Sequence, residues 1–193
     1  MTKTKHPVDR MGLSLPRASW PVGKEAPGSL ELVRRFLNSQ NIENGADGWR
    51  DTVDVRQWLL GEQCDVPARL SRAEVDQLRH VRAGLRSAVS GGPLHQLTSI
   101  AAGVPLTISF DTPVRLVSNG TRIDQFIANL LVSVFASMSD GTWNRLKPCR
   151  NCQWVVFDRS KNRSASWCAD HACSTRHRAR AYRQRVRERS APG

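Results

Sequence analysis

The spacing of four cysteines near the C-terminal end constrains this chain more than any other feature. They follow the pattern C-x2-C-x15-C-x4-C, at Cys149, Cys152, Cys168 and Cys173. The first pair is typical of a zinc knuckle, a turn whose two sulfur atoms point at one ion. The residues between the two pairs suffice for a hairpin that returns to the site. We therefore expect one zinc ion bound by four thiolates.

The expected role of this ion is structural. Residues 145 to 175 hold too few apolar side chains for a core of their own, so zinc would supply most of the local folding free energy, on the order of 10 kcal/mol. A four-thiolate site leaves no position for water or substrate, which argues against hydrolytic chemistry. The alternatives are an iron–sulfur cluster, or unrelated thiols with one disulfide. His171 and His177 are close enough in sequence to compete as ligands.

Positive charge is concentrated in the same part of the chain. The whole sequence has 29 Lys and Arg against 17 Asp and Glu, a formal net charge of +12. Residues 145 to 190 hold 13 basic and 3 acidic residues, a net +10, which leaves only +2 for the remainder. This distribution predicts that the C-terminal segment binds a polyanion such as nucleic acid.

A basic helix is expected to follow the last cysteine, with Ser174 or Thr175 as its cap. Its helical projection predicts a narrow apolar stripe that packs on the finger, with His177 on the exposed side. The stripe comprises Thr175, Ala179, Tyr182 and Val186. Arginine can hold phosphate oxygens or guanine edges with two hydrogen bonds, so we predict that two rows flanking the stripe bind DNA. These rows comprise Arg176, Arg178, Arg180, Arg183, Arg185, Arg187 and Arg189.

Two other functions fit the same residues. A protein that binds structured RNA would use the same arginines, with Trp154, Phe157 and Trp167 as candidate stacking platforms. A protein that docks on RNA polymerase or a sigma factor would use the N-terminal part of the chain instead. Catalytic triads, paired carboxylates and a phosphate-binding loop do not stand out before residue 145, so we do not expect an enzyme.

The remainder of the sequence predicts a mainly helical α+β fold. Apolar periodicity predicts helices near residues 30–37, 51–60, 71–89, 94–101 and 123–138, and a small hairpin over 104–117. Ser71 and Glu74 are a candidate capping box for the third helix, Gly61 suits the position just after the second, and residues 158–166 suit a turn. Trp58 and the apolar residues of the last of these helices, including Phe135, are expected in the core. We expect an irregular lead-in over residues 1–28, a helical domain over 29–144 and the finger with its basic helix over 145–190. Cys64 is expected to be a buried or partly buried free thiol. The sequence has no apolar run long enough for a membrane span and no secretory signal, so a cytoplasmic protein is expected.

The cysteine segment resembles the CGNR-type zinc finger. The resemblance rests on Cys149-x-x-Cys152-x-Trp154-x-x-Phe157-Asp158-x-Ser160-x-Asn162, on Trp167-Cys168-x4-Cys173, and on Arg176, Tyr182 and Arg185. Where the family has Cys-Gly-Asn-Arg, this chain has Cys173-Ser174-Thr175-Arg176. In that family an ABATE domain precedes the finger, and the segment from Leu30 to Leu60 is loosely similar to its start. The resemblance implies a stress-induced transcriptional regulator of bacteria, associated with the nucleoid.

Overall fold

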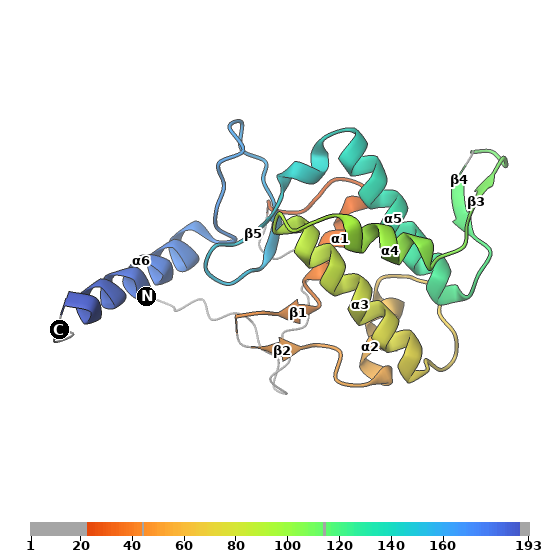
Figure 1. Ribbon diagram of the computed structural model, residues 1–193, viewed down its shortest axis with the longest axis horizontal. Helices are drawn as coiled ribbons and strands as arrows, with labels where there is room; N and C mark the ends of the chain where they lie inside the picture. The colour runs from red at the N-terminus through yellow and green to blue at the C-terminus, as the bar shows by residue number, and fades with distance from the viewer. Residues whose placement is uncertain (1–22, 44, 114, 190–193) are drawn as a thin grey trace.

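The computed structural model describes residues 23–189 except residues 44 and 114, so most of the predicted lead-in lies outside the described residues. The helical elements are α1 (Leu30–Leu37), α2 (Thr52–Gly61), α3 (Arg72–Val89), α4 (His95–Ala102), α5 (Arg122–Ser139), the 3-10 helix η1 (Thr142–Arg145) and α6 (Asp170–Arg189). The strands are β1 (Gln40–Asn41), β2 (Ala46–Asp47), β3 (Leu106–Ser109), β4 (Arg115–Ser118), β5 (Leu146–Pro148) and β6 (Val155–Phe157). They pair in sequence order as antiparallel hairpins. This confirms the predicted α+β fold (Figure 1).

Side-chain caps explain where the longer helices begin. Ser71 and Glu74 form the predicted capping box at the start of α3, and Thr121 and Asp124 form another before α5. The Asp51 carboxylate accepts hydrogen bonds from two backbone N–H groups at the start of α2. Gly61, expected just beyond α2, is instead its last residue.

The core lies where α1, α3 and α5 meet. Its large aromatic side chains pack with their rings inclined to one another, with the ring centroids of Phe36 and Trp49 5.4 Å apart and those of Phe36 and Phe126 5.7 Å apart. Trp58, expected in the core, contacts the same cluster. The guanidinium of Arg82 lies 4.2 Å from the ring centre of Trp49 and pairs with Asp47. This ion pair ties the β1–β2 hairpin, which the sequence did not predict, to α3.

The hairpin formed by β5 and β6 belongs to the same core. Leu146, Val155 and Phe157 are buried in one cluster with the helices. The finger thus shares the main core, and its side chains Trp154 and Val156 also form a small second cluster with the four cysteines. The buried cluster is continuous across residue 145, and the division into domains at that point stays a prediction.

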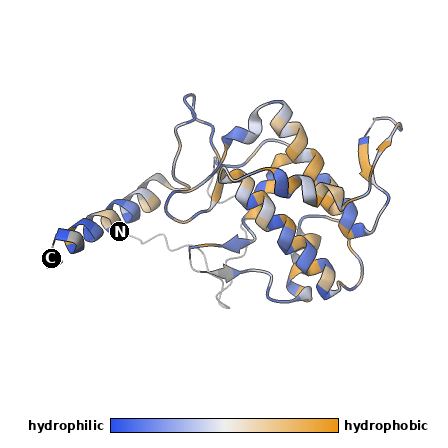
Figure 2. Ribbon diagram, in the orientation of Figure 1, coloured by the Kyte–Doolittle hydropathy of each residue, from blue (hydrophilic) through white to orange (hydrophobic). Residues whose placement is uncertain are grey.

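Helix α6 extends away from this body, at the opposite end of the long axis from the β3–β4 hairpin (Figure 1). Hydrophilic residues dominate α6, whereas hydrophobic residues are prominent on β3 and β4 (Figure 2). Among the described helices, none is both long and apolar enough to cross a membrane.

Candidate metal centre

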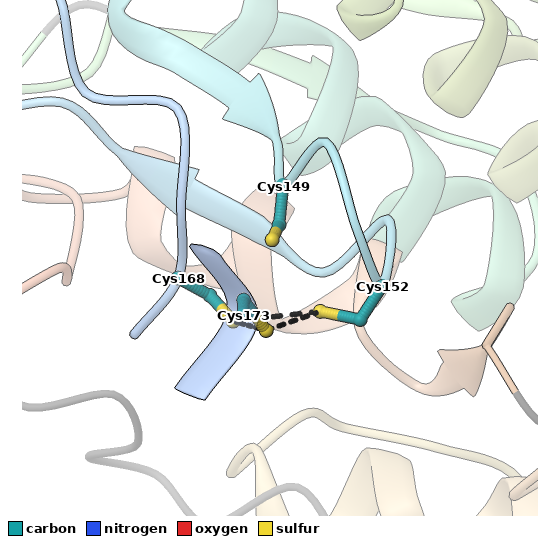
Figure 3. Close-up of side chains that lie close together, drawn as sticks. All are labelled: Cys149, Cys152, Cys168 and Cys173. Carbon is teal, nitrogen blue, oxygen red and sulfur yellow. Dashed lines mark hydrogen bonds between the residues drawn. The ribbon is translucent and has the colours of Figure 1, made fainter. Parts of the chain in front are cut away.

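The four predicted cysteines meet at one buried point (Figure 3). Their sulfur atoms all lie within 4.8 Å of one another. The Sγ atoms of Cys152 and Cys168 are 3.4 Å apart, as are those of Cys168 and Cys173, and Cys173 and Cys152 are separated by 3.8 Å. A disulfide needs about 2.05 Å between sulfur atoms. The five cysteines of the chain are free thiols.

These distances fit a single tetrahedral zinc ion. Zinc–sulfur bonds of about 2.3 Å place the ligand sulfur atoms about 3.8 Å apart. A cluster of several iron atoms would hold four sulfur atoms farther apart, which favours zinc over the iron–sulfur alternative. Four soft thiolates in a closed site are also the donor set of structural zinc. The chain therefore has a zinc-binding site formed by Cys149, Cys152, Cys168 and Cys173.

The ionisation of these thiols shows why the cluster needs a cation. Hydrogen bonds from Cys152 and Cys168 lower the pKa of Cys149 far below its ordinary value. The same hydrogen bonds to Cys149 raise the pKa of Cys152 and of Cys168. Ionisation of one thiol thus makes ionisation of the neighbouring thiols less favourable, because negative charges this close repel each other. A dication offsets this repulsion and holds all the ligands as thiolates.

The first two ligands lie on a tight turn between β5 and β6. The backbone N–H of Cys149 donates to Trp154 O at 2.9 Å, and the N–H of Gln153 donates to Cys149 O at 2.9 Å. Gln153 has a left-handed backbone, with φ of 60°. The predicted knuckle is confirmed. The hairpin was expected between the two cysteine pairs, but its strands β5 and β6 lie on either side of the knuckle instead.

Asp158 organises the loop that returns the chain to Cys168. Its buried carboxylate accepts hydrogen bonds from Ser160 N, Ser160 Oγ, Ala165 N and Lys147 Nζ, at 2.7 to 3.0 Å. Burial alone would raise the pKa of Asp158, but the hydrogen bonds from Lys147 and Ser160 lower it to about 2. The sequence identified a turn here but not this role. An Asp followed two residues later by Ser is the signal that points to it.

The last ligand, Cys173, lies inside the first turns of α6. Its N–H donates to Ala169 O at 2.9 Å, and the helix begins at Asp170. The predicted cap at Ser174 or Thr175 is therefore wrong, because both residues are within the helix. Asn151 Nδ2 and Arg176 Nη2 lie 3.8 and 3.9 Å from Cys173 Sγ, where they can donate to a thiolate.

This placement reverses the predicted orientation of α6. Cys173 is buried, and the ring of His177, one turn later, lies 5.0 Å from that of Trp167, so this side faces the finger. His177 itself is exposed, as predicted. The predicted apolar stripe faces solvent instead, with Tyr182 64% and Val186 44% exposed. The metal site explains the difference, because a metal ligand within the helix determines which side of the helix points inward. The side chain of His171 lies outside the described residues.

The predicted arginine rows differ in their surroundings. Arg176 and Arg180 contact the Glu43 carboxylate at 3.2 and 3.5 Å, and Arg180 also contacts Asn151 Oδ1 at 3.3 Å. Glu43 lies in the loop of the β1–β2 hairpin, and no sequence pattern pointed to its role. Within the described part of the chain, the remaining arginines of α6 are exposed and form no ion pair. They are Arg178, Arg183, Arg185, Arg187 and Arg189.

The helical domain holds the finger in place through the outer edge of β6. The Asn38 amide donates to Val155 O at 2.8 Å and accepts from Val155 N at 2.9 Å. The N–H of Phe157 donates to Lys24 O at 2.9 Å on the same edge. Arg86 of α3 donates to Gln153 O at 3.3 Å within the knuckle. The knuckle and the helical core are thus joined by buried hydrogen bonds.

Comparison with known proteins agrees with this geometry. A search of the curated proteins finds no match to the chain. Residues 145–186 match the family model of the CGNR zinc finger. The matched segment contains all four metal-binding cysteines and the arginines of α6 as far as Arg185. The C-terminal part of this chain is therefore a zinc finger of the CGNR type.

Proposed function

We propose that this protein is a DNA-binding transcriptional regulator of bacteria, and that its zinc site holds α6 in position to contact duplex DNA. One observation carries the proposal. Helix α6 extends beyond the metal centre and has one row of arginines on each side of a narrow, exposed face. The regulatory role and an association with the nucleoid follow from the family resemblance and belong to the same proposal.

The charges of α6 favour a polyanionic partner. Arginines three or four residues apart on one helix repel each other, by about 0.2–0.5 kcal/mol for each pair. In the described structure only Glu43 offsets this repulsion, and it reaches no farther than Arg180. Phosphate groups along a nucleic acid would neutralise the remaining arginines and release counterions.

The shape of α6 fits the major groove of DNA. Its 20 residues span about 30 Å, and the groove is about 12 Å wide. Thr175 and Ala179 are small enough to allow close approach, while the arginine rows on either side would reach phosphates of both strands. The exposed Tyr182 and Val186 could then contact base edges and thymine methyl groups.

Two observations bear on the alternative functions. Two of the three candidate stacking platforms for RNA bases, Trp154 and Phe157, are buried and cannot stack on a ligand without unfolding, whereas Trp167 is partly exposed and packs on His177. This favours duplex DNA over structured RNA that is recognised through stacked bases. We also infer that the finger is not an enzyme, since four thiolates leave the zinc no open position for a substrate. Docking on RNA polymerase stays an alternative that the experiment below can reveal.

The test measures the salt dependence of binding to short duplex DNA by fluorescence anisotropy. Changing Arg178, Arg183 and Arg187 to Ala should make the log-log salt slope shallower by about 3, since each phosphate contact contributes about 0.9. The matched control changes Arg69, Arg72 and Arg115 to Ala, which are exposed on the helical domain. Equal effects of the two triple variants would refute the interface. Stronger competition by RNA, or polymerase binding without DNA binding, would favour the alternatives.

A further inference from the structure

We infer that the end of the molecule opposite α6, formed by α4, the β3–β4 hairpin and α5, binds a second copy of this chain. The inference does not depend on DNA binding. Large apolar side chains are exposed together on these three elements. Phe110 is 82% exposed, Phe135 is 66% exposed, and the others are between 37% and 54% exposed. The full set, called the apolar end here, comprises Leu94, Leu106, Ile108, Phe110, Leu116 and Phe135.

The hairpin turns an apolar face toward the helices. Ile108 is directly opposite Leu116, and side chains two residues apart on a strand share a face, so Leu106 lies on that face as well. The opposite face carries Thr107, Ser109 and Arg115, with Val117 as its apolar member. Hydrophobic residues on β3 and β4 are visible at this end of the molecule (Figure 2). An amphipathic hairpin of this kind normally packs its apolar face on a partner.

A groove of about 390 Å³ lies between the hairpin and the helices. Leu106 and Leu116 form one wall, and Leu97, Val134 and Phe135 are among the residues of the other. Among the described residues, the lining includes no charged side chain and one polar residue, Thr98. Phe135 was expected in the core with the rest of α5, but it stands at the edge of this groove. The groove therefore suits an apolar occupant.

The exposed apolar area supplies most of what a stable dimer needs. The six residues expose about 660 Å² together, if a fully exposed large residue offers roughly 200 Å². The largest apolar patch of an ordinary monomer is about 300–600 Å². A standard interface takes about 800 Å² from each partner, so the apolar end with a surrounding rim reaches that size.

A second copy of the chain fits this end better than a different protein. The protruding tip with Ile108 and Phe110 lies beside the groove, so two copies related by a two-fold axis can each insert a tip into the partner's groove. An interface between identical patches requires this self-complementarity. Charge favours the same arrangement, because each chain carries +12. Contact through the apolar end keeps the two basic α6 helices away from each other (Figure 1).

The test is the mass of the zinc-loaded full chain, measured by light scattering and by sedimentation over a range of micromolar concentrations. We expect twice the 21.6 kDa of one chain. Phe135→Glu and Ile108→Glu should each weaken the dimer at least about 100-fold, because a two-fold interface would bury two unpaired carboxylates. The matched control is Val53→Glu on α2, whose side chain is 59% exposed outside the apolar end.

Both variants must keep the zinc content and the helical circular dichroism of the unmodified chain. If Phe135→Glu disturbs α5, Ile108→Glu on the hairpin provides the same test. A dimer that dissociates with both variants but not with Val53→Glu supports the inference. An unmodified chain that is monomeric at all concentrations would overturn the inference and would indicate that the apolar end binds a different partner. A dimer that persists in both variants would also overturn it.

Discussion

Replacing Asn38 by Ala should destabilise the whole protein, although Asn38 touches neither the zinc ligands nor any arginine of α6. Its buried amide accepts from the N–H of Val155 and donates to the C=O of that residue, at 2.9 and 2.8 Å. In the variant the buried N–H loses its acceptor, whereas the carbonyl keeps Arg34 Nη1 at 3.4 Å. Each unsatisfied buried group costs about 1–3 kcal/mol. With one group unpaired and the other weakened, we expect a loss of about 2–4 kcal/mol in the free energy of unfolding.

The same change should weaken zinc binding. Val155 is three residues from Cys152, and its strand forms one side of the knuckle. If the metal binds only when this strand is docked, the destabilisation appears in the zinc affinity as well. A loss of about 2–4 kcal/mol corresponds to a dissociation constant about 30-fold to several hundredfold higher.

The assay combines urea unfolding, followed by circular dichroism, with zinc competition against a chromophoric chelator. Asn129→Ala is the matched control, because Asn129 is exposed on α5 and its substitution should change stability by no more than about 0.5 kcal/mol. If Asn38→Ala unfolds at the same urea concentration as this control and binds zinc equally tightly, the docking of β6 on α1 plays no part in stabilising the finger.

Three further outcomes are expected. Cys168→Ser should reduce the zinc content from about one ion per chain to near zero. It should also lower the urea midpoint of the whole chain, since Val155 and Phe157 belong to the main core. Retained zinc would contradict the four-thiolate site. The carboxylate of Asp158, with its pKa lowered from 3.8 to about 2, should contribute about 2 kcal/mol that is fully present above pH 3.8 and is lost as the pH falls through about 2. The difference in urea stability between Asp158→Asn and the unmodified chain should shrink over that range, and a constant difference would disprove the contribution. Glu43→Gln should tighten DNA binding, measured by anisotropy, by about fivefold, because its two half-exposed ion pairs share one carboxylate and together contribute about 1 kcal/mol. Unchanged affinity would show that Glu43 does not compete with phosphate.

Local features of the sequence predicted much of the fold. The capping box at Ser71 and Glu74 fixed the start of α3, because it depends on residues only three positions apart. The cysteine spacing predicted the metal site for a similar reason, since its ligands form two pairs whose members are close in sequence. The β1–β2 hairpin was missed because strands of two residues are too short for an alternating pattern.

Contacts between distant segments could not be predicted in this way. Asn38 and Val155 are 117 residues apart, and Glu43 and Arg176 are 133 residues apart, so no periodicity links them. The predicted orientation of α6 was wrong for a related reason. Helical projection correctly grouped its residues into faces, but it could not show which face points inward. That choice is made by Cys173, which the sequence placed before the helix rather than inside it.

The position of α6 depends on contacts near its start. Cys173 binds the metal, His177 packs on Trp167, and the Glu43 carboxylate holds Arg176 and Arg180. The later turns project from this support. Because the knuckle is itself held by Asn38, a change in the helical core can alter the direction of the arginine rows without altering any arginine. Asn38→Ala should therefore weaken DNA binding as well as zinc binding, and excess zinc should restore both together if the metal is the link between them.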